Sequence, residues 1–532
     1  MALPANGTEW PPKAYKPAYD AYRVWDAWYS NDTDRLRSVY AGSGIRPDVV
    51  ARARPSQYAG GIIGKASRWL WGRPSPLNGP DTRLHIPLAS DIARASADML
   101  FSEPPTLAED DVPDDVRKRY EQLLEEDSWH QLLLDGAELD TALGDIYFRS
   151  VIDEDIAPGR AIPALVHADA AIPTIRYGHL IAVRFFRCLL EDGDTYLRLV
   201  EDHTDGRIDY ALYEGRRDNL GQKVPLTEHP DAAVLIPGLD EGSGQETGVK
   251  GLTVERIPNL GPNRRWRGKP QLEQLGRPDI DGVEPGLDAL DEAWTSWMRD
   301  LRLGKARIIA DRNMLESNGP GGGAYLDLDR EVWAPVNVPP SQNNSAPITL
   351  NQFAIRFAEH GATCDALTAW VLRSAGYSTQ TFGEADQVAA TATEVEQRER
   401  RSFTTRNRKI INWKPGLARF LFKHLMLEQA HFGGPAPVRL KLEFGDSVTE
   451  SPLDVAQTVS LLAGAKAASK EVLVRMVHPD WDNGQVKAEV QALKDEEQVA
   501  DPTLMGGADF APPGNDRPGP PGPPAKGQPP GR

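Results

Sequence analysis

The chain has 532 residues, 40% of them hydrophobic and 26% charged, which is typical of a globular protein with about two to four structural units. Its net charge is −17, from 77 Asp and Glu against 60 Lys and Arg, and this disfavours a protein that grips nucleic acid, because phosphate affinity comes mainly from Lys and Arg. Two cysteines, Cys188 and Cys364, exclude a disulfide framework and a Cys-x-x-Cys zinc site and fit the reducing cytoplasm. No apolar run approaches the roughly 18–20 residues of a membrane span.

Helical patterns dominate the N-terminal part. The first 40 residues carry aromatic side chains spaced for one helical face, which we expect to pack in the core: Tyr19, Tyr22, Trp25, Trp28 and Tyr29. A second helix is expected over Ala89–Phe101, because the prolines at 104 and 105 cannot continue it. The stretch 103–140 holds thirteen Asp or Glu against three Lys or Arg with helical apolar spacing, which predicts an amphipathic helix with a solvated acidic face.

Residues 145–260 carry the signals of strands, since apolar and alternating runs lie between Gly, Asp and Pro turns. With the preceding helices they predict an N-terminal α/β body. The whole chain is therefore expected to be α+β and mainly α.

The middle of the chain predicts two long helices joined by a short β-containing excursion. Apolar residues at alternating spacings of three and four mark the first helix: Ile280, Val283, Leu287, Leu290, Trp294, Trp297 and Leu301. Pro285 should kink this helix or move its start to about Gly282. The second helix is expected over about Leu350–Ser374, with Gly376 as its stop and these apolar positions: Leu350, Phe353, Phe357, Cys364, Leu367 and Val371.

A polar loop follows at Tyr377–Gln387, and then a third long helix over about Ala392–Asn412 that begins acidic and turns basic, as the helix dipole favours. Beyond it we expect a strand over Val438–Phe444 and helices at about 453–465, 469–478 and 484–498. The last residues, 501–532, are rich in Pro and Gly, cannot bury apolar surface and should be disordered.

Catalytic signatures are absent from the sequence. Residues Gly60–Ser67 resemble a phosphate-binding loop, but Ala stands at 59 and at 66, where the motif needs Gly and a hydroxyl side chain. No His-Glu-x-x-His or Gly-x-Ser-x-Gly occurs, and no pair among the ten histidines has the helical spacing of metal ligands. We therefore expect no catalytic, cofactor-binding or metal-binding residue, and no enzyme.

Four segments, taken in order, resemble the portal proteins of tailed bacteriophages, in particular the siphophage class. They are Ile86–Pro104; Leu287–Ile308; Thr391–Val395 followed by Arg401 and Thr404-Thr405; and Val477–Trp481 with the acidic helix after it. Each motif alone is weak, but their order over roughly residues 10–500, around a helix–excursion–helix centre, is much more specific. The long Pro-rich tail and the short excursion depart from the family and leave the clip contacts open.

The resemblance implies a portal fold, in which subunits form a ring, dodecameric in the virion, around a central channel. Its regions would be the wing (1–275), stem helix 1 (276–303), the clip (304–347), stem helix 2 (348–376), the tunnel loop (377–391), the tunnel-loop helix with its return to the wing (392–449), the crown (450–500) and the tail (501–532). The implied location is the portal vertex of the capsid, after assembly in the host cytoplasm.

The resemblance also implies partners and site residues. Double-stranded DNA would pass through the channel without sequence specificity, and the partners would be the terminase motor, which supplies ATP hydrolysis, head-tail adaptor proteins, the major capsid protein and a scaffolding protein, with no membrane. The candidate tunnel-loop residues are Ser378, Thr379, Gln380, Thr381, Phe382, Gly383, Glu384, Asp386 and Gln387. The candidate stem-packing residues are Leu287, Leu290, Trp294, Trp297, Leu301, Phe353, Phe357, Leu367 and Val371.

The implied mechanism is passive guidance, because the loop carries no Lys or Arg and should touch DNA sterically rather than grip its phosphates. Two alternatives stay open. One is another phage head structural or head-completion protein, and the other is a nucleic-acid enzyme, which would need a Walker motif or a clustered acidic metal site.

Overall fold

The computed structural model defines two compact units, Met1–Ser447 and Val448–Arg532. It describes residues 3–43, 84–108, 112–125, 128–303, 307–310, 316–317, 324–325, 348–351, 355–383, 392–445, 452–478, 481 and 483–500. The fold is α+β, as the sequence predicts. The phosphate-loop-like segment 60–67 and the tail 501–532 lie outside the described residues.

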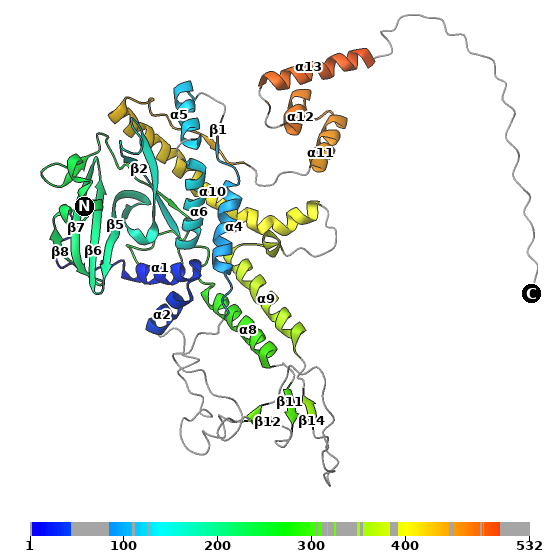
Figure 1. The fold of residues 1–532 in the computed structure, drawn as a ribbon. Coiled ribbons are helices and arrows are strands. Elements are labelled where there is room, and N and C mark those ends of the chain that lie inside the picture. The colour runs from blue at the N-terminus through cyan, green and yellow to red at the C-terminus, as the bar shows by residue number, and fades with distance from the viewer. Residues whose placement is uncertain are drawn as a thin grey trace, which may run out of the picture. The chain divides into compact units, whose positions relative to one another are not determined.

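Two antiparallel sheets of more than two strands form the main β part of the first unit (Figure 1). The larger sheet has the order β4-β5-β6-β7-β8 with β9 on β7, and its strands are β4 (Ala171–Arg176), β5 (His179–Asp192), β6 (Thr195–Thr204), β7 (Arg207–Arg216), β8 (Asn219–Val224) and β9 (Gly244–Glu246). The smaller sheet has the order β10-β2-β3, with β2 (Asp145–Ile152), β3 (Ala161–His167) and β10 (Glu255–Pro258). The predicted strand region is thus confirmed.

Register in the larger sheet is fixed by a buried charge pair. Arg184 on β5 lies directly opposite Asp202 on β6, and its Nε donates to the Asp202 carboxylate at 2.5 Å. Both side chains are buried, and a one-residue slip would separate them and turn every side chain to the other face.

Four helices pack with the sheets around two apolar clusters: α1 (Lys16–Tyr29), α4 (Leu88–Phe101), α6 (Trp129–Leu143) and α10 (Ala392–Phe432). The aromatic side chains of α1 lie in the core, as the sequence predicts: Tyr22, Trp25 and Trp28 are buried, and Tyr19 and Tyr29 are half-buried. Shorter helices are α2 (Thr33–Ser43) and α5 (Asp114–Glu125), and α5 is the predicted amphipathic acidic helix.

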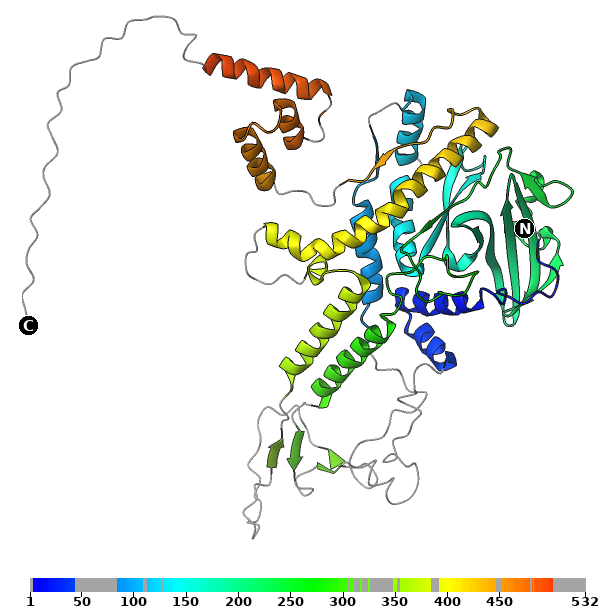
Figure 2. The ribbon, with the colours of Figure 1, turned by 180° about the vertical axis from the view of Figure 1, so that it is seen from behind.

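Helices α8 (Glu284–Leu303) and α9 (Phe357–Ala375) run side by side away from the body (Figure 1; Figure 2 from behind). Helix α8 begins at Glu284 because Pro285 is tolerated in a first turn, where its missing N–H has no helical partner to lose. The expected start of the second helix at Leu350 is wrong. Residues Ile348–Asn351 instead form β14, antiparallel to β11 (Arg307–Ala310), because alternating Ile348 and Leu350 suit a strand.

Within the excursion between these helices, the structure also describes β12 (Glu316–Ser317) paired with β13 (Ala324–Tyr325). The rest of the expected clip lies outside the described residues. At the far end of α9, Gly376 adopts φ +104° and its N–H bonds to the Leu372 carbonyl, which confirms the predicted stop.

Helix α10 extends twenty residues beyond its expected end at Asn412, to Phe432. Pro415 lies inside this helix and removes a helical hydrogen bond, at a cost of about 3 kcal/mol. Burial of Trp413, Leu417 and Phe420 against β2 and α6 offsets that cost. The adjacent Gly416 lets α10 approach β10 closely, because a Cβ there would lie 2.6 Å from Cγ1 of Ile257.

The expected strand over Val438–Phe444 is shorter than predicted. Only Leu442–Glu443 (β15) pairs, with Thr106–Leu107 (β1). Alternation of charged and apolar residues does not suffice here, because the available partner strand is itself two residues long.

The second unit is described as three helices: α11 (Pro452–Gly464), α12 (Lys470–Val477) and α13 (Asn483–Ala500). The side chain of Ser469 caps α12 by accepting from the Val472 N–H. These helices match the three expected from the sequence.

Contact between α8 and α9 depends on the absence of a side chain at Gly286. A Cβ there would lie 2.0 Å from Cζ3 of Trp370, so Gly286→Ala should force the helices apart and lower the free energy of unfolding by about 1–3 kcal/mol. Urea unfolding would measure the change. The matched control is Gly361→Ala in α9, where a Cβ meets nothing within 4 Å, and it should stabilise by up to about 1 kcal/mol. Equal effects of the two substitutions would contradict the packing described.

Candidate functional site

The feature with the most specific architecture is the helical hairpin formed by α8 and α9, together with the turn that follows it. Among the described residues no cluster of three or more His, Cys, Asp or Glu is arranged to hold a metal ion. In that part of the chain, every helix is also too short or too polar to cross a bilayer. The attachment of the hairpin to the body and the side chains that it exposes therefore define the candidate site.

A buried lysine joins the hairpin to the body. Lys409 of α10 is fully buried, and its Nζ lies 2.7 Å from the Asp279 carboxylate, just before α8. The same ammonium donates to the hydroxyl oxygens of Ser96 on α4 (2.6 Å) and Thr141 on α6 (2.9 Å). All three ammonium protons thus have acceptors, which an ion buried in a low-dielectric interior requires.

Asp279 is satisfied from several sides. The phenol of Tyr377, directly after α9, donates to the same carboxylate oxygen as Lys409, and Asn259 Nδ2 donates to the other at 2.8 Å. Burial, and then the charge of Asp279, raises the pKa of Tyr377 well above its ordinary value, so the phenol stays protonated and remains a donor. The Asp279 carboxylate therefore joins the residues just before α8 and just after α9 to Lys409 of α10.

The start of α8 is also held from outside this buried cluster. Trp25 of α1 donates its indole N–H to Glu284 at 3.0 Å. Two turns further on, Asp291 lies 2.9 Å from Nδ1 of His85 and accepts the Ile86 N–H at 2.9 Å. The segment before α4 thereby braces the body-proximal half of α8.

Further from the body, aromatic rings join the two helices. Trp294 and Trp297 stack with ring centroids 4.9 Å apart, and Trp297 meets Phe357 edge-on at 5.3 Å and His360 in a parallel stack at 6.2 Å. Asp300 accepts from His360 Nε2 at 2.9 Å. These contacts fix how α8 and α9 pack along their length.

The predicted stem-packing residues fall into three groups. Leu287, Leu290 and Val371 are buried, while Trp294, Trp297 and Leu367 are half-buried between the helices. Leu301 and Phe357 are exposed, and Phe353 lies outside the described residues.

The hairpin presents an exposed apolar face to solvent. Phe357 is 68% exposed and Trp370 is 41% exposed, and the other members are Leu301 and Ile355. On α9 the exposed small residues Ala358, Ala362 and Ala366 follow one another at a spacing of four and lie on the side of Trp370, whereas Phe357 lies about 140° away from Trp370 around the helix. Large aromatic groups left in water beside small ones form a surface that another helix could cover.

The predicted tunnel loop is folded in its first half. Thr379–Phe382 form a 3₁₀ turn, and the hydroxyl of Ser402 on α10, itself buried, accepts the Ser378 N–H at 3.0 Å and bonds the Thr381 hydroxyl at 2.8 Å. Phe382 is half-buried against Tyr377. Residues 378–383 thus dock on α10, and any free projection of the loop must come from later residues. Glu384, Asp386 and Gln387 lie outside the described residues.

Sequence patterns did not reveal the buried anchor. In the sequence, Lys409 is one of several cations in the basic part of the helix predicted over Ala392–Asn412. Asp279 directly precedes the predicted helix that begins near Ile280, where an N-terminal cap is common. Their pairing spans 130 residues, so no local spacing could predict it. The one available signal was position: Lys409 falls among apolar residues of α10 that repeat at helical spacing.

Comparison with known proteins gives a limited result. No protein-family model matches the chain, and no curated protein matches it. Among solved structures it is similar to a chain in the neck of an empty gene transfer agent (GTA) particle, with a TM-score of 0.39 and 13% identity over 74% of this chain and 90% of that chain.

It is also similar to a chain of the native GTA virion (TM-score 0.37, 12% identity, 78% of this chain and 99% of that chain). A third chain comes from the neck of the native GTA particle with C12 symmetry (0.37, 12%, 74% and 90%). TM-scores below 0.5 at such identities do not define a shared fold.

Breaking the buried anchor should cost far more than breaking a surface pair. Lys409→Met would leave the Asp279 carboxylate buried without a counter-charge, and we expect about 3–5 kcal/mol less stability in urea unfolding. Adding Asp279→Asn should recover part of the loss, because the two substitutions act on one interaction.

The control for this experiment is Arg187→Ala, which removes an exposed pair to Asp231 at 3.6 Å and should have no measurable effect. A loss below about 1 kcal/mol for Lys409→Met would show that the anchor does not hold the hairpin.

Proposed function

We propose that the chain is the portal protein of a tailed phage or phage-like particle, a subunit of the ring through which double-stranded DNA enters and leaves the capsid. In this proposal it sits at the portal vertex of the virion. It has no catalysis of its own, and the terminase motor, head-tail adaptor, capsid and scaffolding proteins are its partners.

The observation that carries the proposal is the order of elements around the hairpin. An α/β body, a long helix, a β-paired excursion and a second long helix follow one another, then a turn, a very long helix and a separate helical unit. This is the order in which the sequence resembles portal proteins over residues 10–500. Helix α10 is longer in the structure than the sequence predicted, and this added length does not change the order of the elements.

The exposed apolar face of the hairpin supports a ring. In a single copy, Phe357 and Trp370 leave large apolar surfaces in water, which is unfavourable by about 25 cal/mol per Å². A helix of a second copy packed against α9 would cover the side of Trp370, and the small side chains Ala358, Ala362 and Ala366 on that side would allow close approach. Repetition of one such contact around an axis closes a ring.

Electron microscopy of the purified chain tests the proposal directly. We expect rings with an axial channel in negative stain. The particle mass should equal that of about twelve chains. The reason is that repetition of one contact between two different faces of the chain closes a ring. Monomers or closed dimers at micromolar concentration would contradict it and would favour a head-completion or other head protein.

The tunnel loop gives a second test. Deleting residues 384–387 removes the part of the loop that follows the 3₁₀ turn but keeps the Ser402 contacts of Ser378 and Thr381. We expect rings to form normally, because the anchor is intact, while packaged DNA is lost or poorly retained in a particle assay. Thr381→Val, which removes only the hydroxyl bond to Ser402, is the control for changes in loop anchoring. Full packaging and retention in the deletion would remove the loop from the mechanism.

A further inference from the structure

A concentrated basic surface stands out in this acidic chain. The loop at residues 262–269 carries four cations, Arg264, Arg265, Arg267 and Lys269, all of them exposed. The buried Trp266 fixes the loop on the body. Only Arg265 is neutralised nearby, by Asp281 at 3.1 Å and Glu284 at 3.3 Å.

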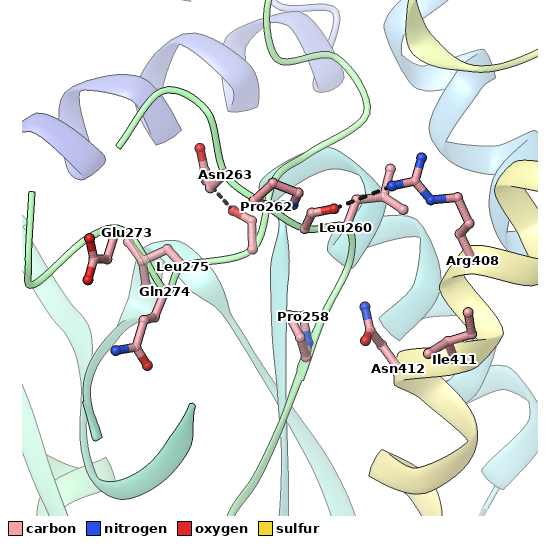
Figure 3. Close-up of a pocket in the computed structure, with 12 residues that line it drawn as sticks. Pro258, Leu260, Pro262, Asn263, Glu273, Gln274, Leu275, Arg408, Ile411 and Asn412 are labelled. Atoms are coloured by element: carbon pink, nitrogen blue, oxygen red, sulfur yellow. Dashed lines mark hydrogen bonds between the residues drawn. The ribbon is translucent and has the colours of Figure 1, made fainter. Parts of the chain in front are cut away.

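Two more guanidinium groups join this surface from other elements. Arg408 of α10 is exposed and donates to the Gly261 carbonyl at 3.4 Å (Figure 3). Arg277 is half-buried. Burial, followed by the charge of Arg264, lowers the pKa of Arg277; Asp279 and Asp281 oppose this shift, and Arg408 adds to it. We call Arg264, Arg277 and Arg408 the basic patch. Among the described residues no carboxylate pairs with any of the three at 4.0 Å or less.

A hollow of about 360 Å³ opens beside the patch (Figure 3). Its wall is partly apolar, from Leu260, Pro262 and Ile411, and Ile411 is 70% exposed. Glu273 is the carboxylate among the lining residues. Apolar side chains beside the cations of the patch suit an acidic protein segment better than a nucleic-acid backbone, which would cover the charges and leave Ile411 in water.

The same chain carries a complementary acidic surface on α5. Val116, Tyr120 and Leu123 are buried, so Asp114, Glu121 and Glu125 lie together on the exposed side, with Lys118 as the cation on that side. The flanking sequence adds five acidic residues at 109–111 and 126–127.

These two surfaces cannot meet within one copy. Helix α5 is fixed to the far half of α10 by the buried pair between Arg119 and Glu428, whose nearest atoms are 2.7 Å apart. Glu428 lies twenty residues beyond Arg408 on the same helix, about 30 Å at 1.5 Å per residue. Charges so far apart are screened from one another at physiological salt.

We propose that the basic patch of one copy receives the acidic side of α5 from the neighbouring copy, an inference that rests on the ring proposed above. Closed rings join two different faces of the same chain, and these are two faces of opposite charge. A two-fold dimer through either surface would instead bring like charges together. The contact would also let a chain of net charge −17 assemble despite its self-repulsion.

A charge-exchange experiment tests the contact in the full chain. The patch variant is Arg264→Glu with Arg408→Glu, the helix variant is Glu121→Lys with Glu125→Lys, and the matched control is Arg216→Glu with Arg217→Glu at the exposed β7–β8 turn. Mass photometry and negative stain at about 0.1 M salt give the fraction of chains in rings.

Each variant alone should form rings at least about tenfold less than the wild type, because like charges then face each other at every contact. Mixing the two variants, or combining all four substitutions in one chain, restores opposite charges at each contact and should restore rings. The control should assemble as the wild type does. Rescue by mixing cannot arise from a misfolded chain, and equal melting temperatures would confirm folding.

Three results would overturn the inference. Normal ring formation by the patch variant, or failure of the mixture to restore rings, would show that these surfaces do not meet. A patch variant that assembles normally but loses binding to a short DNA duplex would assign the patch to nucleic acid. If the wild type itself forms no ring, the portal proposal fails as well. If the wild type and both variants all form rings, only the proposed contact between the patch and α5 is contradicted.

Discussion

The buried pair of Lys409 and Asp279 is the constraint on which the arrangement of the hairpin depends. It brings the start of α8, the end of α9, α4, α6 and α10 to one point, through Tyr377, Ser96 and Thr141. Such a pair contributes little net stability compared with apolar residues of the same volume, but any arrangement that separates the partners leaves a charge buried alone. It therefore selects one direction for the hairpin rather than strengthening the fold in general.

Close backbone approach surrounds this anchor and makes it rigid. Gly144 ends α6 with φ +96°, and the Cβ that another residue would place at Gly276 would lie 1.7 Å from the Gly144 carbonyl oxygen. The chain entering α8 thus passes directly over the end of α6. Because interiors are packed at crystal-like density, the packing of α6 and α10 would resist a displacement of the hairpin.

Local patterns in the sequence were sufficient to predict most helices and strands. They were insufficient to predict where several of these elements end and how the elements contact one another. Helix α4, the strands and the three C-terminal helices follow from periodicity and from Gly and Pro punctuation. Helix α10 passes through Pro415 because Trp413 and Phe420 are buried on distant elements, a tertiary effect that local propensity cannot contain. The same holds for β14, whose extended conformation depends on pairing with β11. It also holds for the buried pair of Lys409 and Asp279, which lie 130 residues apart in the sequence.

Charge has two separate roles in this chain, and their separation explains an apparent conflict. A net charge of −17 keeps the surface from adhering to a polyanion, yet the same charge repels copies of the chain from one another. Segregation would resolve the conflict: the loop around Arg264 holds a local group of exposed cations, while the exposed side of α5 is mainly acidic. Repulsion then acts between most orientations of two copies, and attraction acts in the one that sets the loop against α5. Since like-charge juxtaposition suppresses wrong partners more than ion pairs strengthen right ones, the acidity of the chain would select the geometry of the assembly that we propose.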